Sequence, residues 1–481
     1  DALFLAALAN AIVAGGAVAP GRAGEFADGL ERACDAVAPF TPEAVEAATG
    51  IDAEATRRIA AELAAAPSAA VYGRIGVHTT PFGTLASWAA DRLCLITGNL
   101  DREGGAMWPA PAHSAEPLEP GGRGYRTGRW NSRVGDHPET NGELPVAVLS
   151  GEILTPGDGQ VRALVTIGGN PALSTPDSGR LEEALESLEF MVCVDPALNE
   201  TTRHADVILP PPSQLESSHY DLAFYSLSVR NVANWSPPLF EASGPSEAEI
   251  LTRLTMIAMG LGADADPQAG YDLALDTLLS KAVSTPGSPV EGRDPGELRT
   301  MVTGDDPADQ VLDVMLRLGR HGDGFGAVSD GLSLALLADE PHGIDLGALT
   351  PQLPNILATE SGRIEVLPPQ IEADLDRLAA SISERRPGLV LVGRRDLRSN
   401  NSWMHNVEVL VKGKPRCTLH VNPADARRHG LGDGEDAVVK SAVGELKVPV
   451  EVTDEVMAGV VSLPHGWGHD RPGTRMEVAS R

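Results

Sequence analysis

Three short apolar runs separated by helical segments constrain the fold of this chain more than any other feature of its sequence. Residues 163–168, 190–195 and 205–209 each have the composition of a buried strand. An amphipathic helix is predicted over 181–188, and a shorter one near 199–203. Because parallel strands need crossover connections, this alternation is typical of a parallel sheet with helices on its faces. We therefore expect an α/β domain in the middle of the chain.

Polar loops follow the predicted strands. Parallel sheets bind ligands at the carboxyl ends of their strands, so these loops are the first candidates for a binding site. The first loop reads Gly168-Gly169-Asn170-Pro171, and the second begins at Asp195. Two adjacent glycines allow a ligand to approach the backbone, although a plain tight turn also explains them.

The segment 199–206 places carboxylates and hydroxyls directly before the third strand. Glu200 and Asp206 can accept hydrogen bonds from a guanine or pterin ring edge, and the hydroxyl of Thr201 can meet phosphate. The alternative is structural, with the threonines capping a short helix and Asp206 paired with a neighbouring basic residue. The residues alone leave both interpretations open.

The character of the sequence changes after Gly388, where short β-type runs alternate with turn signals. Such runs at this spacing indicate a small β-barrel. They cover residues 389–393, 416–421, 436–441, 444–452 and 459–463.

A cluster of three arginines, at positions 394, 395 and 398, stands out in an acidic chain. Guanidinium groups suit phosphate, amides suit ring edges, and an aromatic face suits stacking, so the cluster and its neighbours favour an anionic heterocycle. The alternative is a solvated charge cluster. The candidates in this segment are Arg395, Ser399, Asn401, Ser402, Trp403 and His405.

The segment 464–469 reads Pro-His-Gly-Trp-Gly-His. Glycines on both sides of Trp467 would bring backbone close to a flat ligand, and His465 lies beside it; packing of the indole is the competing interpretation. Further ligands for a metal are missing here, so we predict no metal site in this segment.

Composition excludes several classes of function. The chain has 67 acidic and 38 basic residues, a formal net charge of -29. Such a surface repels nucleic acid and anionic lipid, so neither is expected as a partner. The four cysteines have no metal-site spacing, and no apolar run is long enough for a membrane span. We expect a cytoplasmic protein, although residues before Asp1 could direct export.

The length of 481 residues predicts several domains. We expect an α/β region with a helical N-terminus and a long loop over 1–155, an α/β dinucleotide-binding region with a helical insertion over 156–386, and a β-barrel over 387–481. A short buried strand is predicted over 68–73. No hydrolase, kinase or nicotinamide-dinucleotide motif occurs in a supporting context.

These segments together resemble the dimethyl sulfoxide reductase family of molybdenum and tungsten enzymes, which includes formate dehydrogenases and nitrate reductases. The match begins with Thr97-Gly98-Asn99-Leu100-Asp101-Arg102-Glu103-Gly104-Gly105-Ala106 and continues through the 168–171 turn. It then includes Glu200-Thr201-Thr202 with Ala205-Asp206-Val207-Ile208-Leu209-Pro210, followed by Asn422-Pro423, Asp425-Ala426, Gly434, Gly444 and His465-Gly466-Trp467.

The resemblance implies α/β domains followed by a C-terminal double-psi β-barrel. It implies a bis(molybdopterin guanine dinucleotide) centre with molybdenum or tungsten, a small-molecule substrate and a possible electron-transfer subunit, with the cofactor supplying the redox chemistry. It names no catalytic residue and no protein ligand to the metal. The residues expected to bind the cofactor are Gly169, Asn170, Pro171, Asp195, Glu200, Thr201, Asp206, Arg395, Ser399, Asn401, Ser402, Trp403, His405, His465 and Trp467.

Two features of the family are missing from the sequence. Family members usually carry a cysteine cluster for an iron–sulfur centre and a Ser, Cys, selenocysteine or Asp ligand to the metal. We expect both to lie upstream of Asp1. The alternative is a non-catalytic subunit or interaction module that keeps the fold without a redox centre.

Overall fold

The computed structural model describes residues 1–115, 126–384, 388–398, 400–469 and 471–476. The chain forms two compact units, each built from two stretches of sequence: Asp1–Gly124 with Pro212–Glu384, and Tyr125–Pro211 with Arg385–Arg481. The predicted boundary at 386/387 lies close to the last crossing between units, whereas the one at 155/156 does not coincide with a crossing. The three-domain division stays a prediction.

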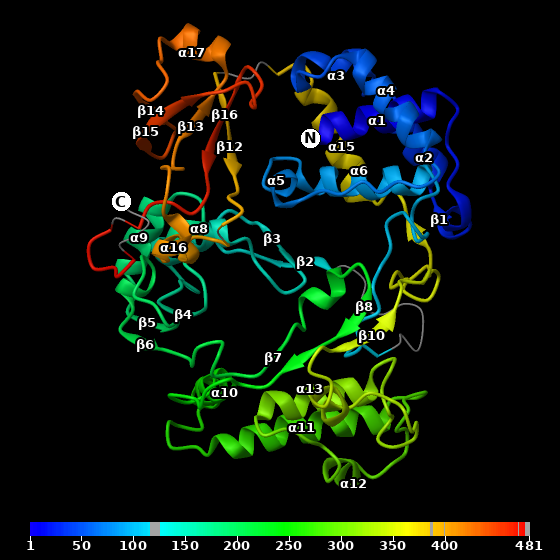
Figure 1. The fold of residues 1–481 in the computed structure, drawn as a ribbon, viewed down its shortest axis with the longest axis vertical. Coiled ribbons are helices and arrows are strands. Elements are labelled where there is room, and N and C mark those ends of the chain that lie inside the picture. Colours follow the sequence, from blue (N-terminus) through cyan, green and yellow to red (C-terminus); the bar gives the residue numbers. More distant parts are fainter. Residues whose placement is uncertain (116–125, 385–387, 399, 470, 477–481) are drawn as a thin grey trace. The chain divides into compact units, whose positions relative to one another are not determined.

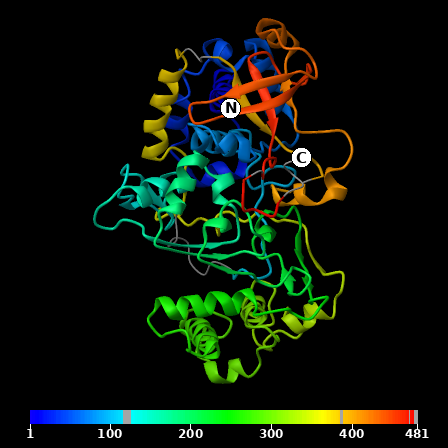
Figure 2. The same cartoon turned by 90° about the vertical axis from the view of Figure 1, so that its left-hand side faces the viewer.

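The first unit has a helical core at its N-terminus. Helix α3 (Pro42–Thr49) begins where the Thr41 side chain accepts from Ala44 N, and α4 (Ala53–Ala65) begins where Asp52 accepts from Ala55 N. Both helices pack against α1 (Ala2–Ala14), which packs on α6 (Gly83–Ile96), and α15 (Pro369–Ser381) packs on α6 in the same apolar core. Figures 1 and 2 both show the yellow α15 beside the blue N-terminal helices.

The turn over 97–106 is anchored from inside the first unit. The buried carboxylate of Asp101 accepts hydrogen bonds from Gln352 N (2.9 Å) and Leu353 N (2.7 Å). The strand predicted over 68–73 is wrong, because this segment pairs with no strand among the described residues. Its N–H groups bond side chains instead, Ala69 N to Asn99 Oδ1 (3.0 Å) and Val71 N to Cys94 Sγ (3.4 Å).

The rest of the first unit is helical with short strand pairs. A separate cluster of buried apolar side chains holds α11, α12 and α13 together. The elements are η1 (Gly21–Phe26), β1 (Ala27–Asp28), α2 (Leu30–Asp35), α5 (Ile75–His78), β7 (His219–Tyr220), η4 (Phe224–Leu227), β8 (Asn231–Ala233), β9 (Trp235–Ser236), α10 (Glu247–Ala258), α11 (Pro267–Ser284), α12 (Pro295–Arg299), α13 (Pro307–Leu318), α14 (Leu334–Ala338), β10 (Ile344–Gly347) and β11 (Ile364–Glu365).

The second unit contains the predicted parallel sheet. Strands β4 (Ala163–Ile167), β5 (Phe190–Val194) and β6 (Val207–Leu209) lie in the order β4-β5-β6 and pair in parallel, which confirms the prediction (Figure 1). Helix α9 (Ser178–Glu186) is the crossover between the first two strands, and it packs with α7 (Leu149–Leu154) on an apolar core. The short elements α8 (Pro171–Ser174) and η3 (Thr202–His204) follow strand ends.

A five-stranded mixed sheet forms the C-terminal part of the second unit, as the β-rich prediction requires. Its order is β12-β16-β13-β15-β14, with a core of small aliphatic side chains. Among the described residues no pairing joins β14 back to β12, so the strands do not close into the predicted barrel. The elements are β12 (Val390–Arg394), η5 (Trp403–Asn406), α16 (Glu408–Val411), β13 (Leu419–Val421), α17 (Pro423–His429), β14 (Asp436–Lys440), β15 (Glu445–Val452) and β16 (Val460–Pro464).

The long loop predicted over 109–160 contains a β-hairpin in the second unit. Strands β2 (Thr127–Asn131) and β3 (Pro138–Thr140) pair antiparallel, before a 3-10 turn η2 (Val146–Val148). The Glu139 side chain is fully buried and accepts from the backbone N and guanidinium of Arg129. Residues 116–125 of this loop lie outside the described residues.

No helix within the described ranges combines the length and apolarity that crossing a bilayer requires.

We expect Glu139→Gln to destabilise the protein at pH 7, with a difference that shrinks in acid. Hydrogen bonds from Arg129 lower the pKa of Glu139 from 4.5 to about 2. A carboxyl with a depressed pKa stabilises the fold above its unfolded pKa, and this stabilisation is lost as the pH falls through the folded value. The gap in Tm between the variant and the unmodified chain should therefore narrow from about pH 4.5 towards pH 2.

Circular dichroism melting at a series of pH values measures this gap. Glu62→Gln is the matched control, because Glu62 and its partner Arg58 are both mostly exposed. A gap for Glu139→Gln that stays constant with pH would contradict the assignment.

Candidate functional site

Three predicted residues of the second unit form one hydrogen-bonded network at the carboxyl edge of the parallel sheet. Asn170 donates through Nδ2 to Glu200 Oε2 (2.7 Å) and accepts through Oδ1 from the Thr201 hydroxyl (2.7 Å). The Thr201 oxygen also accepts from Ala172 N at the start of α8 (3.0 Å). Glu200 and Thr201 are fully buried. The structure therefore brings the 168–171 turn and the 199–206 segment together, as the parallel-sheet prediction requires.

The two glycines of the turn are needed for its conformation. Gly168 and Gly169 have φ of 57° and 101°, a region that side chains rarely adopt. A Cβ built on either would meet no atom within 4 Å, so the turn has open space beside it. Pro171 occupies the first turn of α8, where its missing N–H costs nothing.

The loop after β5 satisfies most of its own polar groups. Asp195 accepts from Ala197 N (2.7 Å) and from Asn199 Nδ2 (3.3 Å), and burial raises the pKa of its carboxyl. Asn199 Oδ1 in turn accepts from the N–H groups of Thr201 and Thr202 (3.0 Å each). These bonds fix the loop that carries Glu200.

Asp206 has a structural partner that the sequence did not indicate. Its Oδ2 accepts from Met191 N (2.7 Å), so the carboxylate links the entry of β6 to β5. The predicted pairing with a neighbouring basic residue is not among the bonds that the structure describes. A direct contact between Asp206 and a cofactor stays a prediction.

His469, which the sequence-based list of cofactor-binding residues omitted, completes the Glu200 network. Its Nδ1 lies 3.0 Å from each carboxylate oxygen of Glu200, and both side chains are fully buried. Burial raises the pKa of Glu200, but hydrogen bonds from His469 and Asn170 outweigh it, so that pKa lies below its ordinary value. The residue was visible as one of two histidines in the 464–469 segment, but no local signal pointed to a partner 269 positions away.

The arginine-rich segment and the C-terminal segment meet at Gly466. This glycine has φ of 91°, and a Cβ there would lie 3.0 Å from His405 Cε1 and 3.1 Å from Asn401 O. The rings of His405 and Trp467 stack obliquely, with centroids 4.5 Å apart. Two segments that the sequence selected independently are therefore in direct contact.

Three buried ring nitrogens in these segments lack a hydrogen-bond partner among the described residues: His405 Nδ1, Trp467 Nε1 and His469 Nε2. A buried polar atom left unsatisfied costs about 1–3 kcal/mol, so native structures rarely tolerate several of them. Burial also lowers the pKa of His405, which keeps that ring neutral near pH 7. These atoms fit a bound polar heterocycle that would supply the missing partners.

The arginines of the cluster have different roles. The Arg394 guanidinium donates to the carbonyls of Ser462 and Thr418 (2.9 Å each), so it holds β12 to its neighbours instead of facing a ligand. Arg395 is exposed, with one long contact to Asn401 Oδ1 (3.5 Å). Partial desolvation lowers the pKa of His465, and the charge of Arg395 lowers it further. Of the two, Arg395 is the one available to an anion.

The remaining predicted residues are less constrained. Ser402 is half-buried, and Trp403 is 50% exposed at the start of η5. Ser399 lies outside the described residues, so its role stays a prediction.

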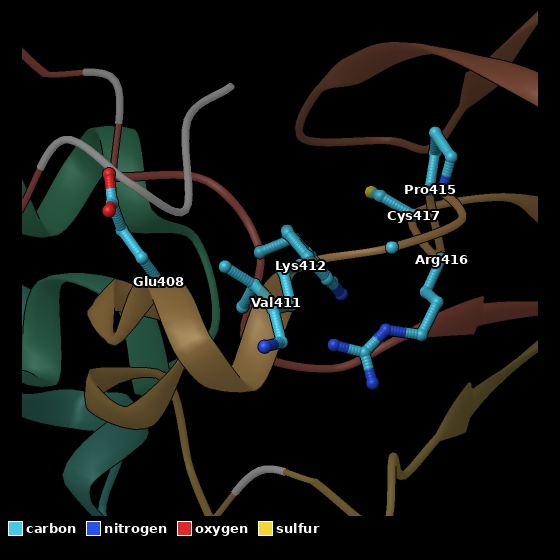
Figure 3. A pocket seen from close by; sticks show the side chains of 8 residues that line it. Glu408, Val411, Lys412, Pro415, Arg416 and Cys417 are labelled. Carbon is cyan, nitrogen blue, oxygen red and sulfur yellow. The ribbon is translucent and has the colours of Figure 1, made fainter.

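A pocket of about 390 Å³ adjoins Trp467 in the same unit. Figure 3 shows Glu408 and Val411 on α16 and, across the pocket, Pro415, Arg416 and Cys417. Arg416 is held by Asp396 Oδ1 (2.8 Å) and the Leu410 carbonyl (2.6 Å). The pocket is further lined by Lys412, Gly413 and Trp467.

In the part of the chain that the structure describes, no three His, Cys, Asp or Glu side chains are grouped so that they could hold a metal ion. The site as built offers hydrogen bonds, aromatic surface and positive charge.

Residues 389–480, which include the arginine cluster and the C-terminal segment, match the family model described as "Molydopterin dinucleotide binding domain". Residues 26–233 match the model described as "Molybdopterin oxidoreductase". The second match includes the 168–171 turn and Glu200, and the first includes His469.

Curated relatives extend over most of the chain. A probable oxidoreductase, YoaE of Bacillus subtilis, is 24% identical over 93% of this chain and 58% of its own length. A formate dehydrogenase alpha subunit of Methanococcus maripaludis is 25% identical over 91% of this chain and 59% of its own length. Biotin sulfoxide reductase of Cereibacter sphaeroides is 24% identical over 89% and 56%.

Among solved structures, acetylene hydratase from Pelobacter acetylenicus superposes with a TM-score of 0.67 at 17% identity, covering 99% of this chain and 64% of that one. This likeness concerns the fold. The chain thus spans less than two thirds of the length of these relatives. On the two family models and the relatives together, the chain belongs to the dimethyl sulfoxide reductase family of molybdopterin oxidoreductases.

Proposed function

We propose that this chain is the cofactor-cradling part of an oxidoreductase that uses molybdopterin guanine dinucleotide with molybdenum or tungsten. The observation that carries the proposal is the contact at Gly466, which gathers His405 and Trp467 with unsatisfied ring nitrogens beside the exposed Arg395. When bound, the cofactor supplies two-electron redox chemistry, and the protein supplies binding and orientation.

The side chains of this chain would divide the work of binding. The exposed guanidinium of Arg395 suits a phosphate, because its planar fork pairs with two oxygens at once. Trp467 Nε1 can only donate, whereas Nδ1 of the neutral His405 ring can accept or donate, according to the tautomer. The glycines at 168 and 169 leave the backbone of the turn open to a close approach.

The substrate class follows from the relatives' names and remains a proposal for this chain. These names refer to formate, biotin sulfoxide and acetylene, so we propose a small-molecule substrate and a reaction like that of formate dehydrogenases or nitrate reductases. One relative is an alpha subunit, which supports an electron-transfer subunit as a partner.

We also propose that the protein works in the cytoplasm. All four cysteines, Cys34, Cys94, Cys193 and Cys417, are free thiols in the structure. Disulfides are rare in reducing compartments, so free thiols are consistent with this location.

We expect the purified protein that carries this chain to contain molybdenum or tungsten together with pterin. Elemental analysis by mass spectrometry measures the metal, and fluorescence of the oxidised, released pterin measures the organic part. Folded protein that lacks both metals and pterin would contradict the proposal and favour the non-catalytic alternative.

We expect Arg395→Ala combined with Asn401→Ala to lower the cofactor content with only a modest fall in Tm. Both side chains are exposed and their mutual contact is long, so the lost side-chain contacts cost little; the left-handed backbone of Asn401 (φ 54°) adds roughly 1 kcal/mol of strain for alanine. Loss of a charge-assisted phosphate contact weakens binding by roughly tenfold or more. Pterin and metal per protein, measured after gel filtration, give the readout.

Arg162→Ala is the matched control for this double variant. Arg162 is 65% exposed and pairs with the exposed Glu189 just before β4, at the amino end of the strand and away from the ligand edge. Cofactor content should stay at the wild-type level in this control. A wild-type cofactor content in the double variant would refute the assignment of Arg395 and Asn401.

A further inference from the structure

One ring nitrogen of His469 is hydrogen-bonded, and the other has no hydrogen-bond partner among the described residues. Its Nδ1 lies 3.0 Å from both carboxylate oxygens of Glu200, and the side chains are fully buried. Its Nε2 is buried and has no hydrogen-bond partner among the described residues. The Glu200 carboxylate thus orients the ring, while Nε2 on the opposite edge of the ring needs a hydrogen-bond partner.

Neither protonation state removes this requirement. A neutral ring that donates through Nδ1 to Glu200 leaves a lone pair on Nε2, and a protonated ring leaves an N–H there. Both need a partner when they are buried, because a polar atom taken from water without compensation is destabilising. No group among the described residues supplies this partner.

The backbone around His469 provides an independent observation. His469 has φ of 65° and follows Gly468, whose φ is 121°. A non-glycine residue in the left-handed region persists only where its surroundings fix it, and such residues concentrate at binding sites. The chain adopts this conformation at the position where the imidazole reaches Glu200.

The position of Glu200 indicates which kind of ligand would lie near His469. Glu200 bonds Asn170 in the turn after β4, and its own loop follows β5. Both loops are at the carboxyl edge of a parallel sheet, the edge at which such sheets bind nucleotides. A ligand bound at this edge of the sheet would therefore present nucleotide groups to His469.

We propose that His469 Nε2 hydrogen-bonds the nucleotide half of the bound molybdopterin guanine dinucleotide, with Glu200 holding the ring in place. This inference rests on the proposed function. His469 is a binding residue in this scheme, and Glu200 is a positioning residue that acts through it. A water molecule at Nε2 is the competing occupant, and the test separates the two.

Two substitutions separate the contact to Glu200 from the contact to the ligand. His469→Asn keeps an amide N–H near the place of Nδ1, so it can still donate to Glu200, but it has nothing at the place of Nε2. His469→Gln carries its amide near the place of Nε2. Isothermal titration calorimetry with guanosine diphosphate on the full chain, prepared without its cofactor, measures affinity, and calorimetric melting measures stability.

We expect His469→Asn to keep a Tm close to that of the unmodified chain and to bind guanosine diphosphate roughly tenfold more weakly, the usual value of one hydrogen bond to a polar ligand. His469→Gln should recover part of the affinity. In protein labelled with ¹⁵N-histidine, the Nε2 resonance of His469 should shift when the nucleotide is added. A purely structural role moves neither the affinity nor this resonance.

Cytidine diphosphate locates the contact. A loss confined to guanosine diphosphate places Nε2 at the base, and an equal loss for both nucleotides places it at the ribose or phosphate; either supports the inference. Unchanged affinity in a folded His469→Asn protein overturns it and leaves the proposed function intact. Failure of the unmodified chain to bind either nucleotide overturns both.

Discussion

The rest of the candidate site depends on the hydrogen bonds that the buried carboxylate of Glu200 accepts from Asn170 and His469. A charge removed from water is costly unless it is paired and hydrogen-bonded, and losing one partner of such a pair leaves the charge uncompensated. Asn170 comes from the turn after β4, Glu200 from the loop after β5, and His469 from the segment that follows β16. Because the carboxylate requires both partners, it fixes three segments that are far apart in sequence in one arrangement.

The elements around this network could be predicted because their signals are local. Apolar runs bounded by turn residues located β4, β5 and β6 within about two residues, and the change of texture after Gly388 located the C-terminal sheet. The carboxyl-edge rule then selected Asn170, Glu200 and Thr201, which the structure joins directly. Burial of continuous apolar strands and the geometry of parallel crossovers suffice for these predictions.

The failures have a common physical cause: polar side chains choose partners that are distant in sequence. Arg394 had the same local setting as Arg395, yet its guanidinium bonds the carbonyls of Thr418, just before β13, and of Ser462 in β16 in place of an anion. The 68–73 segment had the composition of a strand, but its N–H groups donate to side chains of α6 and of the turn that follows α6. Composition describes what a residue can bond, whereas only the fold decides which partner is within reach.

The net charge of -29 adds a constraint on how the site can work. An acidic protein repels a dinucleotide at long range, and salt screens that repulsion beyond about 8–10 Å. Affinity for such a ligand must therefore come from short-range contacts in a desolvated setting, where each hydrogen bond is worth more than in water. Unsatisfied buried nitrogens on His405, Trp467 and His469 provide that setting, with the exposed charge of Arg395 beside them. The site thus depends on local donors and acceptors, and only a few cations are needed within an otherwise repulsive surface.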